Sequence, residues 1–221
     1  MRLFVSAAVK FICGIIMLGA MLFWPAGTFD FAGAWLFMGI LFIPMLGMGL
    51  VMLKKAPALL EKRLDPREKV GTQKAVIAVA ALMFMGVFVL AGLDRRFGWS
   101  DMPDWLMYAG AGLQLAAYGL YMEVMRENAY LSRTIEVQEG QTVVDTGLYG
   151  IVRHPMYAAT VIMFLAMPVV LGSWVSFCVM LIYPFVIVIR ILNEEKVLEA
   201  GLEGYTEYKT KVKYRLVPFI W

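Results

Sequence analysis

Six long runs of apolar residues constrain this chain more than any other feature of its sequence. They cover residues 4–24, 32–53, 75–93, 105–125, 156–172 and 174–192. Because a helix needs about 20 mostly apolar residues to cross a bilayer, these runs predict an all-α, polytopic integral membrane bundle of about six transmembrane helices. The last two runs are separated only by "GSW", which predicts a tight helical hairpin whose arms are short for a bilayer.

The composition agrees with a membrane protein. The chain is 61% hydrophobic and its mean hydropathy is +0.72, whereas a soluble domain is usually about 45–50% apolar. The first apolar run resembles a signal peptide, but it lacks a clear small-x-small cleavage site and continues to Phe23 and Trp24. We therefore interpret it as a retained transmembrane helix.

The basic residues predict how the helices are oriented. Of the 20 lysines and arginines in the chain, 18 fall on one side of the predicted bundle, and only Arg95 and Arg96 fall on the other. Since positive charge accumulates in cytoplasmic loops, both termini and both long polar loops are expected in the cytoplasm. In the basic loop 54–74, "PALLEKRL" predicts either an interfacial helix whose leucines face lipid or a loop on anionic headgroups.

Two classes of partner find no support in the sequence. The net charge of +3 is small and scattered, which speaks against nucleic acid. The two cysteines, Cys13 and Cys178, lie inside apolar runs, and we interpret them as small buried hydrophobic side chains. No cluster of Cys and His has the spacing of metal ligands, so no metal site is expected.

The only histidine, His154, stands where a polar loop meets the fifth apolar run, in "GLYGIVRHPMYAAT". A residue before proline is disfavoured in the α region, and proline favours the first position of a helix. His154 is therefore expected to precede a helix that Pro155 opens. The free amides at that helix start, with Arg153 beside them, predict a site for a carboxylate or phosphate. The alternative is that His154 and Arg153 contact lipid headgroups.

Two acidic residues lie where the last apolar helix leaves the membrane, in "RILNEEKVL". Arg190 and Glu194 are spaced to pair on a helix, and Glu195 points about 100° away from Glu194. Acidic side chains at this depth are costly unless they face the interior of the bundle, so they predict a site for a cationic or hydroxyl-bearing ligand. The alternative is a salt-bridged helix end that extends to the membrane surface.

A third polar stretch, "GYTEYKTKVKYRLVPFIW", is rich in tyrosine and basic residues. By itself it is typical of an amphipathic tail that lies on the membrane. Taken together, the cytoplasmic ends of the hairpin offer an anion site beside an acidic site. A zwitterionic ligand with an additional cation would fit this pair.

These stretches resemble the isoprenylcysteine carboxyl methyltransferase family, and most closely its bacterial members. The resemblance is carried by "TGLYGIVRHPMYAA", "RILNEEKVL" and "GYTEYKTKVKYRLVPFIW"; "ENAYLSRTIEVQEGQTVVDTG" fits the same pattern and "PALLEKRL" fits it more weakly. It covers residues 126–221 strongly and 54–74 loosely. It divides the chain into a four-helix membrane bundle at 1–125 and a catalytic region at 126–221.

The resemblance implies a reaction and a location. It implies S-adenosylmethionine as the methyl donor, bound in a pocket that faces the cytoplasm. It implies a lipophilic or isoprenoid-like acceptor that enters from the bilayer. The short chain suggests a prokaryotic source, and so an integral protein of the inner or plasma membrane in contact with membrane lipids.

The resemblance also implies which residues form the site. Cofactor binding is carried over to Gln138, Gly147, Tyr149, His154, Pro155, Tyr157, Glu194 and Glu195, and catalytic roles are carried over to Arg153, Glu194 and Arg215. We infer that His154 and the amides that follow it bind the carboxylate of the donor. Glu194 or Glu195 would bind its ammonium or ribose, and Tyr149 or Tyr157 would lie near its sulfonium or adenine.

The methyl acceptor stays open at this point. A carboxylate acceptor is ionised at pH 7 and needs no base, whereas an amine must be deprotonated, with a Glu as the candidate base. Methylation of a lipophilic substrate at a carboxyl group, with a thiol or an amine as less favoured acceptors, is the first hypothesis, and phospholipid N-methylation is the second. The third is an NADPH-dependent sterol-type reductase, a class that shares the Arg-His-Pro-x-Tyr stretch but has longer chains. The fourth is a non-enzymatic membrane protein with a degenerate motif.

Overall fold

The computed structural model describes residues 2–55, 57–64, 71–128, 130–131 and 137–221. Within these ranges the regular structure is entirely helical, which confirms the predicted all-α bundle. The elements in chain order are α1 (Arg2–Ala26), α2 (Ala32–Lys55), α3 (Pro57–Leu64), α4 (Gly71–Phe97), α5 (Asp104–Glu127), the 3-10 turn η1 (Gly147–Gly150), α6 (Pro155–Val170), α7 (Trp174–Met180), α8 (Tyr183–Gly201) and α9 (Tyr205–Lys211).

Four helical stretches of the described chain are long and apolar enough to cross a membrane. They are Leu3–Ala26, Ala32–Lys55, Ala78–Phe97 and Trp174–Gly201. α5 is equally long, at 24 residues. α6 is apolar but has only 16 residues, or about 24 Å at 1.5 Å per residue, less than the hydrocarbon thickness of a bilayer. The first arm of the hairpin is therefore short, as the sequence predicted.

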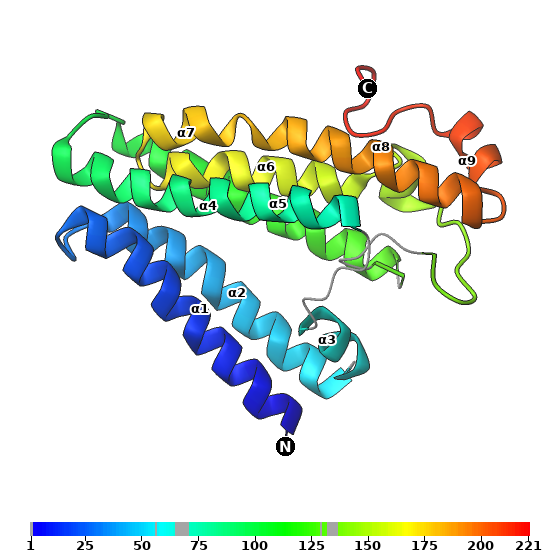
Figure 1. Cartoon of the computed structure of the whole chain (residues 1–221), viewed down its shortest axis with the longest axis horizontal. Helices are drawn as coiled ribbons and strands as arrows, with labels where there is room; N and C mark the ends of the chain where they lie inside the picture. Colours follow the sequence, from blue (N-terminus) through cyan, green and yellow to red (C-terminus); the bar gives the residue numbers. More distant parts are fainter. Residues whose placement is uncertain (1, 56, 65–70, 129, 132–136) are drawn as a thin grey trace.

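The helices form two groups (Figure 1). α4, α5, α6 and the α7–α8 pair run side by side, whereas α1 and α2 diverge from them toward the end that holds the N-terminus. Close approach within the bundle depends on small residues: a Cβ added at Gly92 of α4 would collide with the backbone of Leu22 in α1, and one added at Gly110 of α5 would press on Val169 of α6. The polar loop before α6, α9 and the C-terminal tail all gather at one end of the bundle (Figure 1).

The opposite end of the bundle is fixed by a buried carboxylate. Asp94, 3% exposed at the end of α4, accepts hydrogen bonds from the backbone N–H and the hydroxyl of Ser100. It also accepts one from the hydroxyl of Ser173, in the turn between α6 and α7. The loop after α4 and the turn of the hairpin are therefore tied together, which anchors the far end of the helices that carry the site.

The hairpin of α6, α7 and α8 holds the predicted site residues at its polar end. Its first arm begins as predicted, whereas its second arm is divided into two helices. Pro155 opens α6, and His154 before it has a non-helical backbone (φ −126°, ψ 61°), as expected. The second arm is interrupted between α7 and α8, because Pro184 in the first turn of α8 has no N–H to continue the hydrogen bonding. It then extends to Gly201, beyond residue 192 where the apolar run ends, so the helix includes Glu194 and Glu195, as their predicted helical spacing requires.

Two local expectations were wrong. "PALLEKRL" is a helix, α3, but Leu60 is buried against protein instead of facing lipid. Cys13 and Cys178 are exposed on the surfaces of α1 and α7. Both errors have one cause: the surface of a membrane protein is as apolar as its interior, so apolarity in the sequence does not tell which of the two a side chain faces.

Candidate functional site

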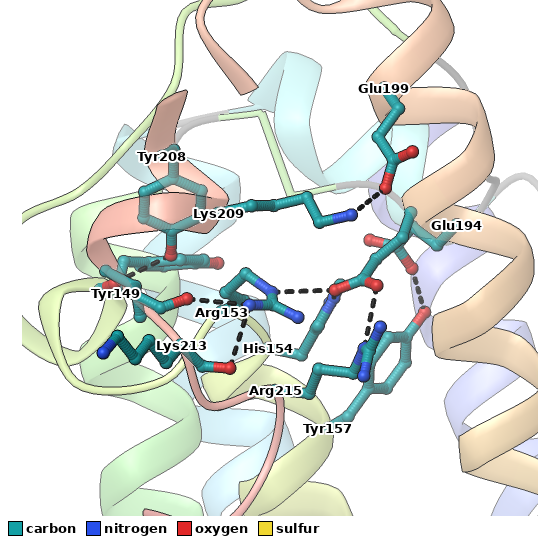
Figure 2. Close-up of polar contacts among 12 residues, drawn as sticks. Tyr149, Arg153, His154, Tyr157, Glu194, Glu199, Tyr208, Lys209, Lys213 and Arg215 are labelled. Atoms are coloured by element: carbon teal, nitrogen blue, oxygen red, sulfur yellow. Dashed lines mark hydrogen bonds and ion pairs between the residues drawn. The ribbon is translucent and has the colours of Figure 1, made fainter. Parts of the chain in front are cut away.

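Glu195, on α8, is the centre of a buried cluster of charges. Its Oε1 accepts a hydrogen bond from Nε of Arg153 and its Oε2 accepts one from Nε of Arg215, both at 2.8 Å. His154 Nε2 lies 3.4 Å from Oε1. Glu195 is only 3% exposed. A buried carboxylate is tolerated when partners of opposite charge compensate it, and Figure 2 shows Arg153 and His154 of one segment close to Arg215 of the C-terminal tail.

Arg153 also fastens the C-terminal tail to the start of α6. Its Nη1 donates to the carbonyl oxygens of Val212 at 2.8 Å and of Lys213 at 3.0 Å. The Nε and Nη1 atoms of Arg153 are thus occupied by protein groups. The arginine joins parts of the chain that are 42 to 60 residues apart in sequence.

The backbone continues this attachment. The N–H groups of Arg153 and His154 donate to the carbonyl oxygens of Tyr214 and Arg215, each at 2.9 Å. The backbone amide of His154 is therefore occupied by the tail, whereas the amides predicted to bind an anion are those that follow Pro155. The first intrahelical bond of α6 comes from the N–H of Ala158. Among the described residues, the amides of Met156 and Tyr157 find no backbone acceptor, so they are the candidate free donors of this helix start.

Glu194, beside Glu195 in sequence, belongs to a different network. The hydroxyl of Tyr157 donates to Oε2 of Glu194 at 2.5 Å and accepts a hydrogen bond from Nε of Arg190 at 2.8 Å. Tyr157 thus joins Arg190 to Glu194, the pair that helix spacing brought to the same face. The two adjacent carboxylates bind different partners, Arg153 for Glu195 and Tyr157 for Glu194, so they point in two directions, as the sequence predicted.

One open cavity collects residues from the separate motifs. It is open to solvent, and the space inside it together with its mouth amounts to about 840 Å³. The lining comes from the loop 128–149, the start of α6, α8 and α9. Among the side chains that line it are Tyr149, His154, Tyr157, Glu194, Tyr205 and Tyr208.

Tyr149 and Tyr208 form a hydrogen-bonded wall of this cavity. The hydroxyl of Tyr208 donates to the carbonyl oxygen of Tyr149 at 2.7 Å. The hydroxyl of Tyr149 accepts a hydrogen bond from Nδ2 of Asn128 at 2.9 Å. Burial raises the pKa of both phenols above the usual value, so both keep their protons at any working pH.

Tyr205, one turn before Tyr208 on α9, has no such partner. It is 4% exposed, and among the described residues its hydroxyl finds no hydrogen-bond partner. Burial, reinforced by the negative charge of Glu195, raises its pKa, so the group is a neutral O–H donor. A buried unpaired hydroxyl costs about 1–3 kcal/mol, and Tyr205 lines the cavity. A ligand with an acceptor atom would satisfy it.

The predicted site residues divide between the cavity and its support. Tyr149, Arg153, His154, Tyr157 and Glu194 line the cavity. Glu195 and Arg215 are not part of its lining and lie in the charge cluster behind it. No group of three or more His, Cys, Asp or Glu side chains in the described residues is arranged to hold a metal ion.

Three further predicted residues also lie outside the lining and fix the backbone conformation around the cavity. They are Gln138, Gly147 and Pro155. Nε2 of Gln138 donates to the carbonyl oxygen of Tyr130, a lining residue, at 2.6 Å. Gly147 has φ +52°, and a Cβ there would overlap the carboxylate of Glu127, so only glycine fits. Pro155 sets the start of α6.

Tyr205 and Tyr208 are the site residues that sequence reasoning missed. Their stretch was expected to lie on the membrane, but α9 packs its tyrosines against Leu198, Leu202 and Val212. The available signal was their spacing of three residues, which places both rings on one face of a helix. That pattern fits a face buried in protein as well as one buried in lipid.

Comparison with known proteins addresses the same region. No curated protein matches the chain. A family model described as phospholipid methyltransferase matches residues 105–203, which run from the start of α5 to just beyond the end of α8. This is an integral-membrane methyltransferase family related to the isoprenylcysteine carboxyl methyltransferases that the motifs resemble. The part of the chain that forms most of the cavity is therefore similar to the phospholipid methyltransferases, and this similarity supports a membrane methyltransferase.

Proposed function

We propose that the protein transfers a methyl group from S-adenosylmethionine to a lipophilic acceptor. The observation that carries this proposal is a single cavity lined by His154 and Tyr157 of one motif and by Glu194 of another, 37 residues further on. All of the lining lies between Asn128 and Tyr208. This supports 126–221 as the catalytic region and 1–125 as a membrane bundle.

The donor and acceptor groups around the cavity fit S-adenosylmethionine. Its carboxylate can bind the free amides at the start of α6, with His154 beside them. Its ammonium or ribose hydroxyls can bind Glu194, the carboxylate that lines the cavity. The unpartnered hydroxyl of Tyr205 can donate to a nitrogen or oxygen of the same ligand. When bound, the cofactor supplies a methyl group that is activated by its positively charged sulfur.

We assign a positioning role to the charge cluster behind the cavity. Arg153 and Arg215 both bond to Glu195, and Arg153 also holds the carbonyl oxygens of the tail. These contacts fix the start of α6, α8 and the tail relative to one another. Methyl transfer depends on alignment of donor and acceptor, so loss of this cluster would lower activity through geometry.

For the acceptor we propose a carboxylate on a lipophilic molecule, as in isoprenylcysteine-type O-methylation. Arg190 lines the cavity beside Tyr157 and offers a positive charge where α8 leaves the apolar part of its sequence. A carboxylate is ionised at pH 7 and needs no base. The remaining tasks of the protein are to align it and to exclude water.

Phospholipid N-methylation is the second candidate, because the family match favours it. An amine must lose its proton before it can attack. Glu194, which lines the cavity and accepts a hydrogen bond from Tyr157, would accept that proton. For both candidates the distribution of basic residues supports an active site on the cytoplasmic side of the membrane.

Binding calorimetry on the detergent-purified protein tests the cofactor. S-Adenosylmethionine and S-adenosylhomocysteine are expected to bind in the micromolar range, and NADPH is expected not to bind. The variant His154→Ala should weaken S-adenosylhomocysteine binding by more than about tenfold, or 1.4 kcal/mol. Binding of NADPH without binding of S-adenosylhomocysteine would reject the proposal in favour of a sterol-type reductase.

Transfer of a labelled methyl group separates the two acceptor classes. A prenylated carboxylic acid and phosphatidylethanolamine are offered in turn at saturating cofactor, and the labelled lipid is counted. With the carboxylate acceptor, Glu194→Gln should retain turnover once the cofactor is saturating, because no proton has to be removed. Labelling of phosphatidylethanolamine alone, lost in Glu194→Gln, would identify the second candidate.

A further inference from the structure

A second cavity lies within the membrane part of the bundle. It is lined by side chains of α2, α4, α5 and α6, and its volume is about 220 Å³. Its walls are almost entirely aromatic and aliphatic, including Phe37, Phe88, Met163 and Met167. It shares no lining residue with the polar cavity at the end of the bundle.

One amide interrupts this apolar lining. Gln114, on α5, is 1% exposed, and its Oε1 has no hydrogen-bond partner among the described residues. An amide oxygen that is removed from water without a partner costs several kcal/mol in hydrocarbon surroundings. A protein that keeps such a group at the wall of a cavity is suited to a ligand that donates a hydrogen bond to it.

The other groups in the cavity wall favour an apolar ligand over water. A buried water needs two to four polar partners, and the lining offers the side chains of Gln114 and Tyr118 as its only polar ones. A cavity of about 150 Å³ lined by apolar residues holds a molecule as large as benzene. A volume of about 220 Å³ therefore suits a hydrocarbon chain of roughly eight carbon atoms.

The cavity lies at the depth of the lipid chains. Phe164 in its wall is seven residues after Tyr157, which lines the polar cavity. That spacing places both on one face of α6, about 10 Å apart along the axis. The surrounding helices α2 and α4 are long enough to span a bilayer, so the cavity lies among segments that lipid chains surround.

We propose that this cavity binds a hydrocarbon chain that carries a hydroxyl group, with Gln114 Oε1 as the acceptor of the hydroxyl's hydrogen bond. The ligand class is a membrane-soluble alcohol, in contrast to the charged ligand of the polar cavity. The site is inferred from Gln114 and the cavity alone, and it does not depend on the proposed methyl transfer.

A matched pair of probes tests the hydrogen bond. The protein in phosphatidylcholine nanodiscs is titrated with 1-octanol or with its methyl ether, which keeps the chain but has no donor, and thermal unfolding is followed. Octanol is expected to raise the unfolding temperature of the wild type more than the ether does. In Gln114→Met this difference should disappear. Equal effects of both probes on the wild type, or a difference that persists in Gln114→Met, would overturn the proposal.

Filling the cavity gives an independent test. Met163→Phe should abolish the effect of octanol, whereas Met122→Phe, the same change at an exposed methionine of α5, should leave it intact. If Met163→Phe fails to fold, the comparison with Gln114→Met still decides. S-Adenosylhomocysteine binding, measured in parallel, should be unchanged in Gln114→Met, so failure of the cofactor proposal and failure of this one give different results.

Discussion

At the scale of single residues, Tyr205 and Tyr208 differ in what their hydroxyls contact. Both rings are buried on one face of α9. The hydroxyl of Tyr208 is bonded to the carbonyl oxygen of Tyr149, while that of Tyr205 has no partner in the described chain. Removing a paired hydroxyl leaves its acceptor unsatisfied, whereas removing an unpaired one relieves a cost. The same substitution should therefore have opposite effects at the two positions.

The first prediction compares these two substitutions. Tyr208→Phe should lower the free energy of unfolding by about 1 kcal/mol. Tyr205→Phe should leave it unchanged or raise it, yet weaken S-adenosylhomocysteine binding by about tenfold. Thermal unfolding and calorimetry on both variants measure the two quantities. Equal loss of stability in both variants would show that Tyr205 is paired within the protein.

The second prediction separates the adjacent carboxylates. Glu195→Gln leaves Arg153 and Arg215 without their charged partner and should lower the free energy of unfolding by about 3 kcal/mol. Glu194→Gln removes a group that lines the open cavity and should change stability by less than about 1 kcal/mol while weakening ligand binding. Unfolding curves and calorimetry distinguish the variants; similar curves for both would refute the division of roles.

Sequence reasoning predicted the features of the site that depend on local helix geometry. It did not predict which charged side chains pair with one another. The start of α6 at Pro155 and the two directions of Glu194 and Glu195 follow from short-range rules of helix geometry. Which carboxylate faces the ligand depends on where Arg153 and Arg215 lie. Those contacts join residues 20 and 42 positions apart, and no local pattern encodes them.

At the scale of elements, α9 and the tail close the polar end of the hairpin. Tyr205 and Tyr208 are two of the four buried residues of the apolar cluster around α9. This part of the fold therefore depends on phenol groups that stay uncharged. The polar end of α8 also depends on partners elsewhere in the chain. It is helical and partly buried because Arg153 and Arg215 compensate the charge of Glu195.

The third prediction concerns alkaline pH. Burial raises the pKa of Tyr149, Tyr205 and Tyr208 above 10.0 in the folded protein. Because the folded state holds these protons more tightly than the unfolded state, their contribution to stability is complete below pH 10.0 and is lost as the pH rises above it. The unfolding temperature should be flat from about pH 7 to 9 and fall above pH 10.

Circular dichroism melts across this pH range measure the effect. Tyr205→Phe serves as the matched variant, since it removes one of the three titrating groups and should make the alkaline decline shallower. An unfolding temperature that stays constant to about pH 11 would contradict the burial of these phenols.

At the scale of the whole molecule, the described chain has two polar ends of different character. One end carries the loop before α6, α9 and the tail (Figure 1). The other is closed by short loops and by Asp94 with its serine partners. The composition and the long apolar runs sufficed to predict this architecture, because a helix that crosses a bilayer needs about 20 mostly apolar residues. They could not predict that α1 and α2 diverge from the remaining helices.

The fourth prediction is the orientation in the membrane. A reporter enzyme fused after Trp221 should be active only in its cytoplasmic form, and one inserted at Gly98, in the loop after α4, should be active only on the outer side. The physical reason is the excess of basic residues at the end that holds the tail. The reversed pattern of activities would overturn the assignment of the cytoplasmic face.

The attachment of the tail to Arg153 has a consequence for biosynthesis. Val212, Lys213 and Arg215 are added to the chain after Arg153 and Glu195, so the groups that complete the charge cluster are the last of it to be synthesised. Until then Arg153 can bond Glu195 but lacks its carbonyl acceptors. The charge cluster behind the polar cavity is therefore completed only when the last segment docks, and a chain truncated before residue 212 is expected to leave Arg153 and the start of α6 without their attachment to the tail.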